Sequence, residues 1–253
     1  MSSYRNSGVR LPIMQGSPPA LIPQRADWDR PPWNRWAFQN VREILATAEV
    51  WRGRGAVREL PRADRDLDAL MVKGAGGDAV TLAPLLDETY TDGFLVIKDG
   101  AAAYERYFNG MTERGLHLSQ SMAKSVTAAA AGYALADGGF NACLRDYGRF
   151  GLLYLEGGIV PHGWIEATRN GNHAIFHAPY TFTLPEGAYK NQWWIEDMRS
   201  RAIMARGVFG QMIYVNWDYN LVAVKLSIWP DFLNVDFNIA TLAAIHTLAG
   251  ELS

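Results

Sequence analysis

The spacing of apolar residues first changes near residue 93, from a helical to a strand-like pattern. Before that point, Phe38, Val41, Ile44 and Leu45 recur at intervals of three and four. This spacing places them on one face of a helix, and it predicts a helix over residues 35–48. Two further helices are expected over residues 64–73 and 82–89.

The strand-like pattern begins with a run of β-favouring residues at 93–98. Asp99-Gly100 follows, and both positions of a type I′ turn need positive φ, which this pair tolerates. A second strand is expected over residues 101–108. The two segments therefore predict an antiparallel hairpin.

The second half of the chain repeats the mixture of helices and strands. An alanine-rich helix is expected after Ser119, an N-cap candidate, and it should end at Asp137-Gly138-Gly139. Further helices are predicted over residues 144–156, 161–170 and 236–252, and strands over 190–196, 211–217 and 221–229. Residues 172–187 read as a loop. Together they predict an α/β protein of the α+β type, in which helices flank a central antiparallel sheet whose middle pairs sequence-distant strands.

Prolines separate the first segment from the rest. Pro18-Pro19, Pro23 and Pro31-Pro32 disfavour regular helix, so residues 1–35 are predicted to form an extended arm. Residues 36–253 are predicted to form one domain, in which 36–137 supply the N-terminal part and 138–253 complete the sheet.

The first chemical candidate is a serine and a lysine three residues apart. Ser121 and Lys124 share one face of the alanine-rich helix. A serine hydroxyl becomes a good nucleophile when a base removes its proton, and a neutral lysine one turn away can do so. Ser-x-x-Lys is the arrangement of serine β-lactamases and penicillin-binding proteins. The alternative is a solvated pair on an ordinary helix, since short motifs match by accident.

Composition narrows the remaining possibilities. The formal net charge is −2, which gives no electrostatic case for binding nucleic acid or a membrane surface. The single cysteine, Cys143, excludes an internal disulfide and fits a reducing, cytoplasmic location. His173 and His177 lie in a proline-containing loop, and no metal-binding motif stands out. We therefore expect no cofactor and no metal, and a small-molecule partner.

Five blocks of sequence resemble the 6-aminohexanoate-dimer hydrolases, which are nylon-oligomer hydrolases of the serine β-lactamase-like fold. The blocks lie at residues 31–38, 89–96, 121–125, 192–194 and 224–231. The resemblance extends from about residue 25 to the C-terminus. It is much more specific than Ser-x-x-Lys alone, and it implies a serine β-lactamase-like fold.

The resemblance also implies roles for individual residues. Ser121 would be the nucleophile that forms an acyl-enzyme, and Lys124 the general base. The third family box would fall on Ala205-Arg206-Gly207, with the N–H groups of Ser121 and Val208 as the oxyanion hole. Gly207, Phe209 and Trp193 would line the substrate cleft. Because Ala205 stands where β-lactamases have a cation, neutral amides or esters are the expected substrates.

The chain departs from the family after the serine helix. There the family carries a helical subdomain with a Tyr-x-Asn box, whereas Asp137-Gly138-Gly139 leads directly into residues 140–146. This junction resembles an internal deletion. The Tyr-x-Asn at Tyr189-Lys190-Asn191 lies elsewhere in the alignment, and we interpret it as a coincidence.

The deletion has physical consequences. Without the subdomain, residues 128–135 would be partly exposed, which favours a homodimer, and Lys124 would be better solvated and mostly protonated. We expect a serine hydrolase that cleaves amides or esters, of the 6-aminohexanoate-oligomer or carboxylesterase type, with reduced activity. The alternative is an inactive truncated remnant or a self-associating module of the same fold.

Overall fold

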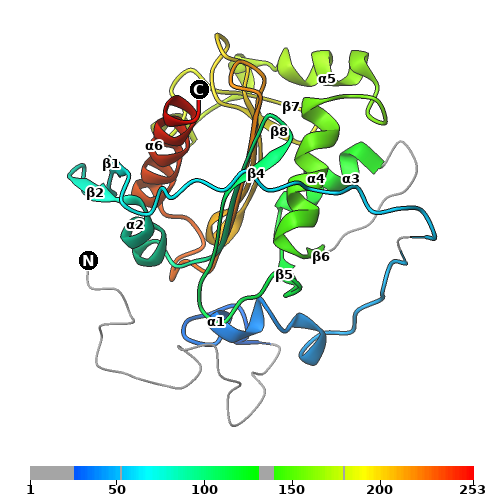
Figure 1. The fold of residues 1–253 in the computed structure, drawn as a ribbon, viewed down its shortest axis with the longest axis vertical. Coiled ribbons are helices and arrows are strands. Elements are labelled where there is room, and N and C mark those ends of the chain that lie inside the picture. Colours follow the sequence, from blue (N-terminus) through cyan, green and yellow to red (C-terminus); the bar gives the residue numbers. More distant parts are fainter. Residues whose placement is uncertain (1–25, 52, 131–139, 179) are drawn as a thin grey trace.

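A seven-stranded antiparallel sheet forms the centre of the computed structural model, which describes residues 26–51, 53–130, 140–178 and 180–253 (Figure 1). The strands run in the order β4 (Ala101–Tyr107), β3 (Thr91–Lys98), β11 (Leu221–Ser227), β10 (Gln211–Asn216), β9 (Ile203–Gly207), β8 (Trp193–Ile195) and β7 (Ala188–Lys190). The pairing of β3 with β11 joins segments more than 120 residues apart, with Lys98 opposite Leu221. The predicted fold class is confirmed, including the pairing of sequence-distant strands.

Helices cover both faces of this sheet. On one face lie α3 (Met122–Ala130) and α4 (Leu144–Leu155), and on the other lie α2 (Leu82–Glu88) and α6 (Val235–Glu251) (Figure 1). Alternate residues of β10 and β11 point to opposite faces of the sheet and belong to different cores. Ile213 and Val222 belong to the core under α4, whereas Met212 and Ala223 belong to the core under α6. This period of two is the expected consequence of the strand pleat.

Close packing of α4 on the sheet depends on a small residue. A Cβ atom at Gly151 would lie 2.5 Å from Val222 Cγ1 and 3.2 Å from Ile213 Cγ2. The helix therefore approaches β10 and β11 more closely than a larger side chain would allow.

The hairpin prediction is confirmed in detail. β3 and β4 pair antiparallel, and Asp99 and Gly100 have φ values of 51° and 78°. The expected helices over 82–89, 144–156, 161–170 and 236–252 also form, the third as α5 (His162–Arg169).

The helix predicted over residues 35–48 is wrong for most of its length. Only α1 (Asn34–Ala37) is α-helical, and a 3₁₀ turn, η3 (Val41–Glu43), follows it. The side-chain amide of Asn40 donates to the backbone oxygen of Trp36 at 2.9 Å. This local bond takes the carbonyl that the next helical N–H would need, a known way in which asparagine competes with helix.

The helix predicted over residues 64–73 is also wrong. Residues 61–65 are extended beside β4, where Ala63 N and Arg65 N donate to the carbonyls of Ala102 and Ala103 at 2.8 Å each. Residues 71–73 form β1 (Met71–Lys73), which pairs with β2 (Ala79–Thr81). Pairing with a sheet edge has overridden the helical spacing, as tertiary contacts often do.

The strand predicted over residues 190–196 is a hairpin of two strands. β7 and β8 are joined at Asn191 and Gln192, whose φ values are 53° and 65°. The remaining short elements are β5 (His117–Leu118), β6 (Asn141–Ala142) and the 3₁₀ turns η4 (His173–Ile175), η5 (Tyr180–Phe182) and η6 (Val208–Gly210).

Three expectations fall wholly or partly outside the described residues. They are the first 25 residues of the arm, the end of the serine helix with most of its predicted exposed face, and the junction at 137–139. Where the structure is described, no helix is long and apolar enough to cross a bilayer.

Candidate active site

The segment that delivers Ser121 to the sheet edge is a short turn between β5 and α3. Gln120 has a positive φ of 48°, and Ser121 immediately precedes the first helical residue, Met122. The N-cap role expected of Ser119 is wrong. Its buried hydroxyl accepts a hydrogen bond from Phe140 N at 3.1 Å instead, which ties the turn to β6.

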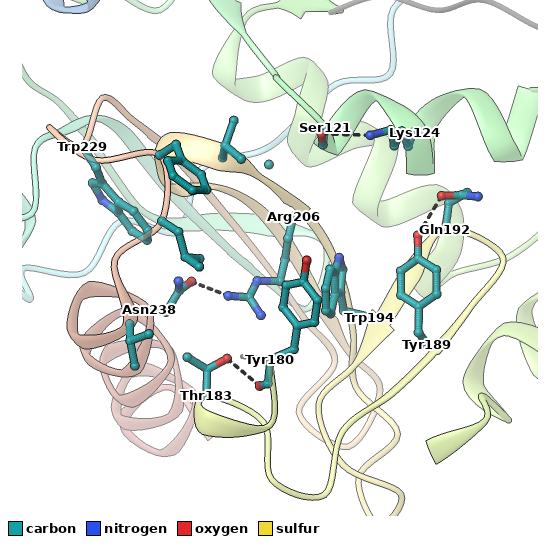
Figure 2. A pocket seen from close by; sticks show the side chains of 15 residues that line it. Ser121, Lys124, Tyr180, Thr183, Tyr189, Gln192, Trp194, Arg206, Trp229 and Asn238 are labelled. Atoms are coloured by element: carbon teal, nitrogen blue, oxygen red, sulfur yellow. Dashed lines mark hydrogen bonds between the residues drawn. The ribbon is translucent and has the colours of Figure 1, made fainter. Parts of the chain in front are cut away.

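Ser121 and Lys124 point toward one another at the start of α3 (Figure 2). Lys124 Nζ donates to Ser121 Oγ across 3.2 Å. Ser121 is half-buried and Lys124 is exposed. The serine oxygen is therefore within reach of an amine, which is the geometry that activation of the hydroxyl requires.

The end of β9 lies directly against this turn. A Cβ atom at Gly207 would lie 2.6 Å from Ser119 O and 3.1 Å from Met122 N. Only a residue without a side chain lets the strand come so close. Among the described residues, the backbone N–H groups of Ser121 and Val208 have no hydrogen-bond partner within the chain. Two free donors at the end of a strand and the start of a helix are suited to an oxyanion.

These residues open onto a pocket of about 240 Å³. Its lining is Ser121, Lys124, Tyr180, Thr183, Tyr189, Gln192, Trp194, Arg206, Gly207, Val208, Trp229, Phe232, Leu233, Val235 and Asn238. The structure thus brings four of the predicted site residues together, from the turn before α3, from α3 itself, from β9 and from η6. Their catalytic roles stay predictions.

Two predicted cleft residues lie elsewhere, which corrects the sequence interpretation. Trp193 is fully buried in the core and donates its indole N–H to Tyr154 at 3.1 Å. Phe209 packs on the ring of Phe38, with the ring centroids 5.3 Å apart. Neither lines the pocket. Strand alternation explains the first error, because it is Trp194 on β8 that faces the cavity.

Tyr189 and Gln192 are pocket residues that the sequence interpretation did not select. Tyr189 donates its hydroxyl proton to Gln192 Oε1 at 2.7 Å, and burial raises the pKa of this phenol. Ser125 Oγ donates to Gln192 O at 2.6 Å, so α3 holds the β7–β8 turn in place. Asn191 turns away and donates to Thr168 Oγ1 at 3.0 Å. Only the tyrosine of the literal Tyr-x-Asn sequence therefore reaches the pocket.

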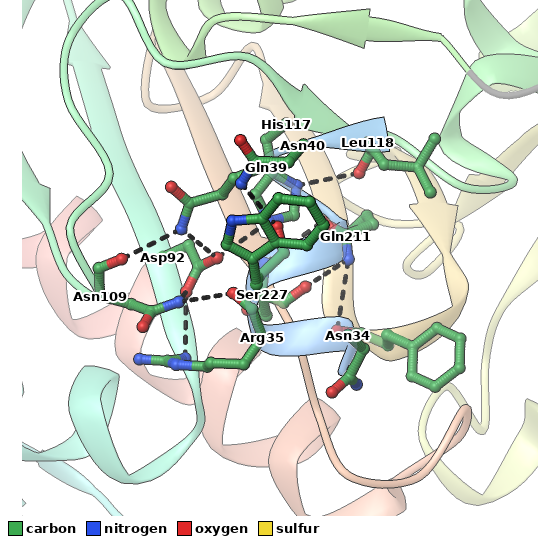
Figure 3. A network of polar contacts seen from close by, with 12 residues as sticks. Asn34, Arg35, Gln39, Asn40, Asp92, Asn109, His117, Leu118, Gln211 and Ser227 are labelled. Atoms are coloured by element: carbon green, nitrogen blue, oxygen red, sulfur yellow. Dashed lines mark hydrogen bonds and ion pairs between the residues drawn. The ribbon is translucent and has the colours of Figure 1, made fainter. Parts of the chain in front are cut away.

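A buried polar network anchors the chain just before the serine (Figure 3). Its centre is Asp92 on β3, which accepts hydrogen bonds from Arg35 at 3.0 Å, Gln39 at 2.9 Å and Asn109 at 3.2 Å. His117 Nε2 lies 3.2 Å from the same carboxylate. Burial alone would raise the pKa of Asp92, but Arg35 and the other partners hold it below its usual value.

Nothing in the described part of the chain assembles a metal centre, since no three His, Cys, Asp or Glu residues come together there. Burial raises the pKa of the Cys143 thiol to about 11, so this thiol is a poor nucleophile at neutral pH.

The sheet order, the serine helix and the strand beside it define the class of protein: the chain has the serine β-lactamase-like fold. A β-lactamase from Mycobacterium bovis shares this fold, with a TM-score of 0.51 and 13% identity over 68% of this chain and 99% of that one. The likeness to a Bacillus anthracis protein, provisionally named a 6-aminohexanoate-dimer hydrolase, is greater. There the TM-score is 0.77 with 18% identity, over 92% of this chain and 99% of the other.

In sequence, the chain is similar to the 6-aminohexanoate-dimer hydrolase of Paenarthrobacter ureafaciens. The two are 32% identical over 115 residues, which is 42% of this chain and 29% of that protein. The matched part is thus less than a third of the curated relative's length. No protein-family model matches. The resemblance stated from the sequence blocks is confirmed by this match and by the shared fold.

Proposed function

We propose that this protein is a serine hydrolase that cleaves amide or ester bonds through an acyl-enzyme at Ser121. The observation that carries the proposal is the 3.2 Å contact between Ser121 Oγ and Lys124 Nζ at the mouth of a pocket. The similarity to a 6-aminohexanoate-dimer hydrolase supports an amide bond as one substrate class.

The chemistry follows from the positions of these groups. Neutral Lys124 Nζ accepts the Ser121 proton while Oγ forms a bond to the substrate carbonyl carbon. The carbonyl oxygen gains negative charge and accepts hydrogen bonds from the N–H groups of Ser121 and Val208. The bond to the leaving nitrogen or oxygen then breaks, and that atom takes the proton from Lys124. Water attacks the acyl-enzyme by the same route and releases the acid.

Turnover is proposed to be weak. Lys124 is exposed, and an amine in contact with solvent is held less firmly against the serine hydroxyl than one enclosed in a cleft. Only nine residues, 131–139, separate the end of α3 from Phe140, too few for the helical lobe that the resemblance implies. General acid–base assistance contributes about 100- to 10,000-fold in rate, so a less effective base lowers turnover by up to that factor without removing the nucleophile.

The test is covalent labelling followed by intact mass measurement. A fluorophosphonate should add one label to the protein, and Ser121→Ala should abolish it. Lys124→Met should slow labelling by at least about 100-fold without changing the far-UV circular dichroism. Cys143→Ala is the matched control, since it removes the single thiol and should label at the normal rate.

Hydrolysis of a p-nitrophenyl ester provides the second measurement. Turnover that persists in Ser121→Ala, together with labelling at another residue, would show that the centre is elsewhere. No labelling and no turnover in the folded protein would leave the alternative, an inactive protein of the same fold.

A further inference from the structure

The turn η6, which carries the N–H of Val208, has a strained backbone. Val208 is followed by Phe209, whose φ of 61° and ψ of 20° lie in the left-handed region, and then by Gly210 with a φ of 86°. A bulky residue rarely adopts this conformation, which persists only where its surroundings enforce it. The direction of the Val208 N–H therefore depends on contacts from outside η6.

The segment after β11 supplies part of this restraint through backbone hydrogen bonds. Trp229 N donates to Phe209 O at 3.3 Å, and Phe209 N donates to Phe232 O at 2.9 Å. Both bonds are made by the left-handed residue itself. Residues 229–232 therefore hold η6 at the point where it is strained.

The indole ring of Trp229 supplies a second restraint. A Cβ atom at Gly210 would overlap Trp229 Cε2 and lie 2.6 Å from Nε1, so the ring rests directly on the backbone of the turn. Trp229 is only 2% exposed, and its Nε1 has no hydrogen-bond partner among the residues that the structure describes. The ring therefore acts on the turn through its shape and not through a hydrogen bond.

Three other elements fix the position of Trp229. Asn34 of α1 donates from Nδ2 to Trp229 O at 3.3 Å. Phe237 of α6 packs edge-on against the indole, with the ring centroids 5.6 Å apart, and Lys225 Nζ of β11 lies 5.4 Å from the indole centroid. These contacts converge on one side chain, which also lines the pocket (Figure 2). A side chain held in this way is rigid enough to support the turn.

We propose that Trp229 is a positioning residue for the oxyanion site: its ring rests on Gly210 and so keeps the Val208 N–H directed at the substrate's carbonyl oxygen. As a statement about turnover the inference rests on the proposed function, but the contact between ring and turn does not. The alternative is that Trp229 only forms a wall of the pocket. A wall contributes to ground-state binding and so to KM, whereas the position of an oxyanion donor matters in the transition state and so for kcat.

The first measurement is the steady-state hydrolysis of p-nitrophenyl butyrate. Trp229→Phe keeps an aromatic ring but reduces its area over Gly210, and it should lower kcat by about 10- to 100-fold with KM within about threefold of the wild type. Trp229→Ala should lower kcat by about 100- to 1,000-fold, as the removal of one oxyanion donor does. A higher KM at unchanged kcat in both variants would overturn the proposal and make Trp229 a wall residue.

Trp217→Phe is the matched control. It also replaces a tryptophan that packs against the core, but one that lies between β10 and β11, outside the pocket. Both kcat and KM should stay at the wild-type values even if the melting temperature falls. An equal loss of kcat in Trp217→Phe would mean that general destabilisation, and not the support of η6, explains the effect.

Gly210→Ala tests the same contact from the side of the turn. Its Cβ atom would displace the ring, so kcat should fall by about 100-fold. The double variant Gly210→Ala/Trp229→Ala should lose much less than the product of the two single losses, because either change alone already breaks the contact. Losses that multiply in the double variant would show that the two residues act independently, contrary to the proposal.

The last measurement needs no chemistry. Amide hydrogen exchange, followed by NMR, reports on the Phe209 N–H, which is bonded to Phe232 O. Trp229→Phe should speed exchange of this amide by at least about 10-fold and leave exchange within β10 unchanged. Unchanged exchange at Phe209 would overturn the proposal. If the wild type is neither labelled nor active but the Phe209 amide responds to Trp229→Phe, the proposed function has failed while the support of η6 by Trp229 is confirmed.

Discussion

The buried Asp92 carboxylate provides a demanding test of how the site is held, through the substitution Asp92→Ala. The side chains of Asp92 and Arg35 are both fully buried, and Arg35 Nε and Nη2 have no hydrogen-bond partner among the residues that the structure describes. Removal of the carboxylate leaves an uncompensated buried cation, which costs about 3–5 kcal/mol in free energy of unfolding. Gln39, Asn109 and His117 lose an acceptor as well. Since domains of this kind are stable by about 5–15 kcal/mol, the loss is a large part of the total.

The assay is urea denaturation followed by circular dichroism at pH 7, with three variants compared. Asp92→Ala should lower the free energy of unfolding by at least about 3 kcal/mol, and Asp92→Asn, which keeps the shape and one acceptor, by less. The double variant Arg35→Met/Asp92→Leu should recover much of the loss, because it removes both charges together. The reasoning is refuted if Asp92→Ala unfolds within about 1 kcal/mol of the wild type, or if the double variant is less stable than either single one.

The pH dependence gives an independent check. The pKa of Asp92 is lowered in the folded state, so its contribution is fully present above the unfolded value of about 3.9 and is lost as pH falls through the folded pKa. The stability difference between wild type and Asp92→Asn should therefore be constant from pH 7 to about pH 5 and shrink at lower pH. If the stability difference between wild type and Asp92→Asn vanished near pH 7, a group other than Asp92 would be responsible for it.

Three further substitutions test Gly207 and Tyr189 in the site and Lys225, a buried residue of β11. Gly207→Ala should cut esterase turnover and fluorophosphonate labelling by at least about 100-fold, because its Cβ would meet Ser119 O at 2.6 Å; normal labelling would mean that the strand can retreat. Tyr189→Phe should lower turnover by about 100-fold at unchanged thermal stability if its hydroxyl relays the Lys124 proton to the leaving group; a shift in melting temperature alone would make it a packing residue. Lys225→Met should stabilise the protein at pH 6–7 and flatten the stability profile, because burial lowers the pKa of Lys225 to about 7, whereas an unfolded lysine titrates near about 10.4. In urea denaturation, the free energy of unfolding of the wild type minus that of Lys225→Met should therefore rise from pH 7 to 10. A difference that stays constant or falls with pH would be inconsistent with a buried amine at Lys225.

The parts of the fold that were predictable are those in which local pattern and tertiary role agree. The β3–β4 hairpin combines continuous β-favouring residues with an Asp99-Gly100 turn whose φ values are positive at both positions. The spacing that predicted a helix over 144–156 turns out to face the sheet, where Tyr147 and Leu152 are buried. In these elements the residues nearest in sequence determine the structure.

The failures arise where distant partners decide the structure. Nothing within residues 61–65 reveals that the edge of β4 will accept their N–H groups. Likewise, the residue pattern at 202–205 alone does not predict a strand, and only the resemblance places Ala205-Arg206-Gly207 on one; the alternation that turns Arg206 into the pocket follows from β9. Had β9 been identified, the adjacent Gly207 and Arg206 would have been assigned to opposite faces from the pleat alone.

The geometry at Ser121 is held by contacts that the described chain supplies itself. The Asp92 network contacts His117 and so holds the segment that leads to Ser121. Ser119 accepts a hydrogen bond from Phe140 N, and Ser125 donates one to the β7–β8 turn. None of these contacts needs a helical lobe after α3. Folding of the site and the efficiency of its chemistry are therefore separable: the lobe that the resemblance implies bears on how well Lys124 is shielded, whereas the position of the serine depends on the sheet and its neighbours. A variant can accordingly keep a labelled, well-placed Ser121 and still turn over slowly, which is the combination that the proposed function requires.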